Sequence, residues 1–178
     1  FLEFGIATAH TAYTSYCFEN ATAIADTPVF NDYPALDSHY PGAKFIYLAR
    51  EKTPWIASIR QLLLRMHTNL TRPDGGFNIH IKRCYLTTFT DLSIDNINQD
   101  DYLAKCYNTH LANAREYFKH RSNDYLEIDI AKPQSFAQLT AFLDIKSERT
   151  DFEKMNIGGK VTAWNDIKHP LKIDSTAK

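Results

Sequence analysis

The stretch KFIYLAREKTPWIASIRQLL, residues 44–63, shows most clearly how this chain folds. Its apolar beginning predicts a buried strand over residues 44–49 that ends at Arg50. A helix is expected over residues 54–70, because apolar side chains recur there at helical spacing. Thr53 suits the N-cap of that helix, and the proline after it suits the first helical position. The stretch therefore predicts a strand that passes directly into a helix, with Arg50 between them.

The same two patterns recur along the chain. Strands are expected over residues 21–25 and 124–130, helices over 99–120 and 133–145, a short helix or turns over 31–43, and the end of a helix stopped by Gly5 over 1–6, while 79–98 is ambiguous. Strands that alternate with helices predict an α/β protein with a mostly parallel sheet and helices on both faces. Ligands bind beyond the carboxyl ends of the strands in such sheets, which makes Asp26 and Arg50 candidate site residues.

Length, charge and cysteine content narrow the class of protein. The 178 residues predict one domain over residues 1–178, with a polar and partly irregular tail over residues 147–178. The formal net charge of −1 gives no global attraction to nucleic acid or to an anionic membrane. Three widely spaced cysteines argue against a disulfide framework or a zinc site.

The expected location is the cytoplasm, with reduced thiols. No apolar run is long enough to span a bilayer, and no signal peptide is visible. Sequons at Asn20 and Asn69 would allow glycosylation if the chain instead entered a secretory lumen.

Arg50 and Ser58 together suit an anion. Arg50 leaves the strand where the sheet opens, and the free N–H groups of the following helix point into the same space. Ser58 lies about one turn inside that helix, so its hydroxyl can join them. A guanidinium, a hydroxyl and a helix N-terminus are the groups that bind phosphate. The alternative is an arginine paired with a nearby carboxylate and a serine on the solvent face, and spacing alone leaves both open.

The segment YPGAKFIYLAREKTPWIASIR resembles the 3′-phosphate-binding segment of the sulfotransferases that use 3′-phosphoadenosine-5′-phosphosulfate (PAPS). That segment is an apolar strand ending in arginine, with a serine eight residues later, as at Arg50 and Ser58. Four further pieces resemble the family's bacterial-type branch in the same order: ADTPVFNDYPALDSHYPGAKFI, YNTHLANAREYFKHRSNDYLEIDI, FAQLTAFLDI and DFEKMN. The likeness extends from Leu2 to about Asn156.

The resemblance implies a fold and a reaction. The fold would be a three-layer sandwich like that of the P-loop NTPases. The reaction would be in-line transfer of a sulfuryl group from PAPS, without a metal, to a hydroxyl or amine of a small-molecule acceptor. Arg50 and Ser58 would hold the 3′-phosphate of the donor. Neither a nucleic-acid nor a membrane partner is expected, and the oligomeric state is not predicted.

The second phosphate site of that family is missing from the chain. The family places a P-K-x-G-T-T-S-L-like loop after its first strand, and FLEFGI resembles the end of the helix that follows this loop. The first strand and the loop are therefore expected before Phe1. The alternative is a degenerate relative that binds the nucleotide weakly or not at all.

Asp26 is the candidate base for the proton of the acceptor. It follows the strand before that of Arg50, where many cytosolic sulfotransferases carry a catalytic histidine, so an aspartate departs from their pattern. The alternative is that Asp26 caps the turn before Pro28. His10 is a second candidate, although its segment TAHTAY is more typical of a loop.

Other polar residues are expected to have structural roles or a looser link to the donor site. Asp129 is expected to be structural, anchoring the helix that follows, and Lys160 lies in a segment loosely similar to the late R-K-G-x-x-G-x-W segment that closes over the 3′-phosphate. Arg115, Lys119, His120 and Arg121 are expected to form the solvated end of a helix.

Two other functions remain open from the sequence. A nucleotide or small-molecule kinase of the same fold would share the missing loop, although ATP has no 3′-phosphate for Arg50 and Ser58 to hold. A non-catalytic binding domain would need no such loop at all.

Overall fold

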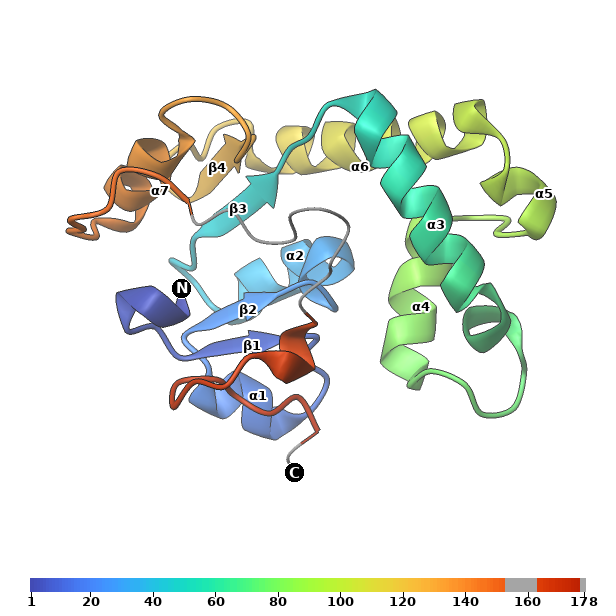
Figure 1. Ribbon diagram of the computed structural model, residues 1–178, viewed down its shortest axis with the longest axis horizontal. Coiled ribbons are helices and arrows are strands. Elements are labelled where there is room, and N and C mark those ends of the chain that lie inside the picture. Colours follow the sequence, from blue (N-terminus) through green and yellow to red (C-terminus); the bar gives the residue numbers. More distant parts are fainter. Residues whose placement is uncertain (153–162, 177–178) are drawn as a thin grey trace. The chain divides into compact units, whose positions relative to one another are not determined.

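The structure, a computed structural model, describes residues 1–152 and 163–176. The chain divides into two compact units: Phe1–Phe30 with Lys132–Lys178, called unit 1 below, and Asn31–Ala131, called unit 2. Each unit contains helices and one pair of parallel strands, so the chain is an α/β protein, as predicted (Figure 1).

Unit 1 contains strands β1 (Thr8–His10) and β2 (Ala23–Ala25), joined by helix α1 (Ser15–Asn20). The strands are parallel, and their register places His10 opposite Ala25. The tail borders the other edge of β1: the Thr8 N–H donates to the carbonyl of Leu171 at 2.9 Å, and the Ile173 N–H donates to that of Thr8 at 2.9 Å. A small core gathers between these elements, made of Ala9, Ala12 and Cys17 with Phe18, Ala21, Ile24 and Ile173 around them.

Three further elements belong to the described part of unit 1: the 3₁₀ turns η1 (Leu2–Phe4) and η3 (Trp164–Asp166), and helix α7 (Ser135–Leu143). Gly5 ends η1 with φ 74°, the left-handed conformation that glycine adopts without strain, as expected for a stop residue. The Phe4 ring packs against Phe136 of α7, with centroids 5.9 Å apart.

Unit 2 contains strands β3 (Phe45–Leu48) and β4 (Tyr125–Ile128), which are parallel and lie where strands were expected. Helix α2 (Val29–His39) precedes β3, and helix α6 (Asp100–Phe118) precedes β4. Phe118, the last residue of α6, is buried against both strands, with ring centroids 5.0 Å from Phe45 and 4.8 Å from Tyr125. This aromatic contact joins α6 to the strand pair.

Helix α3 (Lys52–Thr71) packs against α4 (Ile79–Thr88), α5 (Ile94–Ile97) and α6. Its buried Leu63 and Leu70 are seven positions apart, two helical turns, so they lie on one face. The helix begins two residues before the predicted start, with Glu51 at the N-cap, so the prediction of Thr53 as the N-cap is wrong. Proline is accepted anywhere in the first turn, where N–H groups lack intrahelical acceptors, so it does not fix the first residue.

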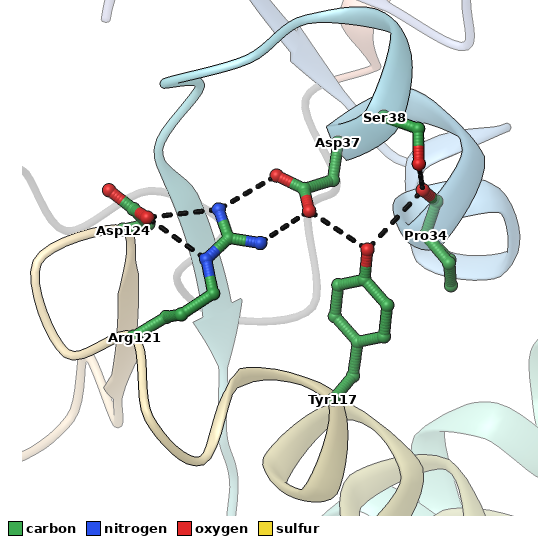
Figure 2. A network of polar contacts seen from close by, with 6 residues as sticks. All are labelled: Pro34, Asp37, Ser38, Tyr117, Arg121 and Asp124. Carbon is green, nitrogen blue, oxygen red and sulfur yellow. Dashed lines mark hydrogen bonds and ion pairs between the residues drawn. The ribbon is translucent and has the colours of Figure 1, made fainter.

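A polar network stands before the two strands of unit 2 (Figure 2). Arg121, between α6 and β4, donates to both carboxylate oxygens of Asp37 in α2, and to Asp124 at 2.9 and 3.0 Å. The Tyr117 hydroxyl donates to the same Asp37 carboxylate at 2.8 Å. These hydrogen bonds hold the pKa of Asp37 below its usual value, with Arg121 as the main cause. The network ties α2, α6 and β4 together.

Candidate functional site

Arg50 lies in the connection between β3 and α3, directly after the last sheet hydrogen bond. That bond runs from the Ala49 N–H to the carbonyl of Ile128 at 2.8 Å. The Arg50 residue is exposed, and its guanidinium has no hydrogen bond or ion pair with any residue that the structure describes. The alternative of an arginine paired with a nearby carboxylate therefore finds no partner within residues 1–152 and 163–176.

Ser58 lies in the second turn of α3 and is also exposed, without a hydrogen-bond partner among the described residues. The Glu51 side chain makes no capping hydrogen bond at the start of this helix. The N-terminus of a helix attracts anions, because its first N–H groups have no intrahelical acceptor and the helix dipole is positive there. Arg50, this helix start and Ser58 follow one another along the chain, and their common use for one phosphate stays a prediction.

Asp26 follows the last residue of β2 and lies beside His10, the last residue of β1. The Asp26 Oδ2 is 3.7 Å from His10 Nε2, and it accepts a hydrogen bond from the Thr11 hydroxyl at 3.4 Å. Both side chains stay open to solvent, with 35% of the Asp26 side chain and 40% of the His10 side chain exposed. The two candidate bases of the sequence analysis therefore form one pair at the carboxyl end of a parallel strand pair.

The Asp26 side chain does not cap its own turn. Its contacts within the described residues are with Thr11 and His10, and not with a backbone N–H. Asp26 and Thr11 both have left-handed backbone conformations, with φ 68° and 63°. For a β-branched residue such as Thr11 this is unfavourable, by about 1–3 kcal/mol, and such strain is commonly found at functional sites.

The tail completes the surroundings of His10. The His10 ring stacks on Trp164 with centroids 5.6 Å apart, and the Ser175 hydroxyl donates to the His10 carbonyl at 2.5 Å. The Lys172 ammonium group holds the backbone around Trp164 by donating to the Trp164 and Ile167 carbonyls at 2.6 and 2.9 Å. Nine residues of this tail, Trp164, Lys172 and Ser175 among them, also line a pocket of about 530 Å³. Sequence reasoning assigned His10 to a loop, because a three-residue strand gives too little pattern to recognise.

Four further predicted residues have clear places, and one lies outside the described residues. Asp129 accepts the Ala131 N–H at 2.9 Å, a local contact, and its expected role of anchoring the following helix stays a prediction. Arg115, Lys119 and Arg121 form ion pairs with Glu127, Glu116 and Asp37, so this helix end is held by carboxylates rather than merely solvated. Lys160 lies outside the described residues.

One contact at Arg50 had no signal in the sequence. Tyr107 of α6 places its hydroxyl against the backbone of Arg50, accepting its N–H at 3.3 Å and donating to its carbonyl at 2.8 Å. Tyr107 lies 57 positions later in the chain, so only the packing of α6 brings the two together.

The described residues contain no group of three or more histidine, cysteine or acidic side chains that could hold a metal ion. None of the described helices combines the length and apolar character that a bilayer crossing requires. Cys17, Cys84 and Cys106 are all buried, and none of them is in a disulfide.

Comparison with known proteins gives a family. A family model for the sulfotransferase domain matches residues 5–161. No curated protein matches the chain.

Proposed function

The chain belongs to the sulfotransferase domain family, and on this premise we propose that PAPS is its donor and that a hydroxyl or amine of a small molecule is its acceptor. The observation that carries the proposal is the family match over residues 5–161. It is joined by Arg50, which is exposed, has no side-chain partner among the described residues and lies in the segment that resembles this family's 3′-phosphate-binding segment. We further propose the P-loop NTPase-like sandwich as the complete fold, one domain over residues 1–178, and a cytoplasmic location.

Arg50 and Ser58 hold the 3′-phosphate of the donor in this proposal. The guanidinium offers a planar pair of donors that matches two phosphate oxygens, and the hydroxyl offers a further donor. The absence of any described partner supports this role, because binding would not have to break an existing ion pair. The uncapped start of α3 adds N–H groups of favourable polarity.

Asp26 takes the proton in the transfer step. The acceptor oxygen or nitrogen forms a bond to sulfur, and the bond between sulfur and the 5′-phosphate oxygen breaks. Adenosine 3′,5′-bisphosphate leaves, and the acceptor proton passes to the Asp26 carboxylate. Exposure of this carboxylate supports the role, since a base has to reach its substrate. Its neighbour His10 is the next candidate should Asp26 not be the base.

Calorimetry on the full chain tests the nucleotide part of the proposal. Arg50→Ala is expected to weaken binding of adenosine 3′,5′-bisphosphate by roughly ten- to hundredfold, because a hydrogen bond to a charged group contributes about 1.5–3 kcal/mol. Binding of 5′-AMP, which lacks a 3′-phosphate, is expected to change little. Arg65→Ala, an exposed arginine later in α3, is the matched control and should leave both affinities unchanged.

Two results would contradict the proposal. Equal losses for the two ligands would give Arg50 a structural role. Tighter binding of ATP than of the bisphosphate, with no effect of Arg50→Ala, would favour a kinase of the same fold.

A further inference from the structure

We propose that Tyr107 is a positioning residue for Arg50: its hydroxyl fixes the backbone from which the guanidinium reaches the 3′-phosphate. This inference rests on the proposed function, because it concerns the same phosphate contact. It assigns a task to a buried tyrosine on α6.

The backbone of Arg50 follows the last hydrogen bond between β3 and β4. The last sheet hydrogen bond of β3 ends at Ala49, and α3 begins at Lys52. Backbone N–H and carbonyl groups need partners, and here one side-chain hydroxyl supplies both. A tyrosine hydroxyl can accept and donate at once, and Tyr107 does so, at 3.3 Å from the Arg50 nitrogen and 2.8 Å from its carbonyl oxygen.

The hydroxyl of Tyr107 is itself held in place. The residue is 8% exposed, and its ring packs against Trp55 of α3 with centroids 4.8 Å apart. An aromatic side chain has few rotatable bonds, so a packed ring fixes the position of its hydroxyl. Tyr107 therefore connects three elements at one point: α6, the first turn of α3 and the connection after β3.

The guanidinium has no such support among the described residues. Arg50 is an exposed residue, and its guanidinium has no hydrogen bond or ion pair with any residue that the structure describes. The backbone of Arg50 is the part of this residue that described contacts hold. A binding group that starts from a fixed backbone loses less freedom when it binds, which raises affinity without a new contact to the ligand.

The test is a pair of tyrosine-to-phenylalanine variants of the full chain, with adenosine 3′,5′-bisphosphate and 5′-AMP as ligands in calorimetry. Tyr107→Phe keeps the ring against Trp55 and removes the hydroxyl. It is expected to weaken bisphosphate binding by about three- to tenfold, the size of a lost preorganisation rather than of a lost charge, and to leave 5′-AMP binding unchanged. Tyr102→Phe is the matched control, because its hydroxyl also donates from α6 to a backbone carbonyl, that of Thr90.

A double variant separates positioning from general damage. If Tyr107 acts through Arg50, Tyr107→Phe in the Arg50→Ala background should cause no further loss of bisphosphate affinity. A purely structural role would instead add its loss to that of Arg50→Ala.

Amide hydrogen exchange gives a readout that needs no ligand. The Arg50 N–H is expected to exchange faster in Tyr107→Phe than in the wild type, and at the wild-type rate in Tyr102→Phe. This measurement also shows whether the variant is folded.

The outcomes distinguish failure of the positioning role of Tyr107 from failure of the proposed function. A Tyr107→Phe variant with the affinities of Tyr102→Phe, or with losses that add to those of Arg50→Ala, overturns the positioning role and leaves the proposed function intact. An Arg50→Ala variant with normal bisphosphate affinity overturns the proposed function and the positioning role together.

Discussion

Arg121 stands before the paired strands β3 and β4, and Arg50 stands after them, and the two arginines have opposite surroundings. Arg121 uses its guanidinium on two carboxylates, those of Asp37 and Asp124, and leaves its backbone to ordinary turn hydrogen bonds (Figure 2). Arg50 has its backbone held by the Tyr107 hydroxyl, while its guanidinium has no described partner.

The difference separates a charge that holds the fold from a charge that is free to bind. A guanidinium already shared by two carboxylates would have to give up these contacts to receive a phosphate. An unpaired and exposed guanidinium would lose only water. In parallel sheets ligands bind at the carboxyl ends of the strands, which is the end of this strand pair where Arg50 lies.

The largest expected effect concerns another polar residue at the carboxyl end of a strand, Asp26 after β2 in unit 1. Asp26→Asn is expected to lower turnover by about 10²–10⁴-fold, the usual contribution of a positioned base, and to keep the nucleotide affinity. Folding should change by less than about 0.5 kcal/mol, because the side chain is half-exposed and asparagine also accepts the left-handed conformation at this position. Turnover is measured with an acceptor found by screening. Near-normal turnover would move the base to His10, with His10→Gln as the next variant.

The next effect concerns the stability that the Arg121 network gives to unit 2. Arg121→Ala is expected to lower the free energy of unfolding more than the loss of an ordinary surface ion pair does, because it leaves the Asp37 carboxylate, in a residue only 8% exposed, without its main partner. Arg115→Ala is the matched control: its ion pair with Glu127 is more exposed, and its loss should cost only about 0.2–1 kcal/mol. Urea unfolding measures both. Equal costs would mean that the Arg121 network adds no more than an ordinary surface ion pair.

The smallest expected effect is a dependence on pH. Because hydrogen bonds from Arg121 and Tyr117 lower the pKa of Asp37 in the folded chain, its carboxylate stabilises the fold above the unfolded value of about 3.9, and this contribution is lost as the pH falls through the lower folded value. Asp37→Asn should therefore be less stable than the wild type at pH 6, and the gap should shrink below about pH 4. Thermal unfolding at pH 6 and pH 3 measures the gap. A gap that is equal at both values would exclude the linkage.

The sequence was sufficient where one pattern ran long enough. Helices α3 and α6 and strands β3 and β4 lie within a few residues of their predicted bounds, because many apolar residues repeat at one spacing in each. The family resemblance was also confirmed, over residues 5–161. Two regions were not predicted: β1, which has only three residues, and the stretch that forms α4 and α5, whose spacing favoured no single structure.

The candidate site divides in the same way. Arg50, Ser58 and Asp26 could be named from the sequence, because each lies at a strand end or helix start that the pattern predicts, and their roles stay proposals. Two relations could not be foreseen. His10 meets Asp26 only through the pairing of two short strands, and Tyr107 meets Arg50 only through the packing of α6. Contacts between distant parts of a chain depend on the fold and leave no local spacing to recognise.

The division of the chain also sets an order for its assembly during synthesis. Unit 2 is continuous, so all of its residues are available once Ala131 has left the ribosome. Unit 1 is built from both ends of the sequence, and His10 receives the hydroxyl of Ser175, which is made 165 positions later. Domains fold as their residues emerge, and contacts between distant residues form late. The unit with Arg50 is therefore expected to mature first on the ribosome, and the surroundings of the candidate base only after Ser175 has emerged.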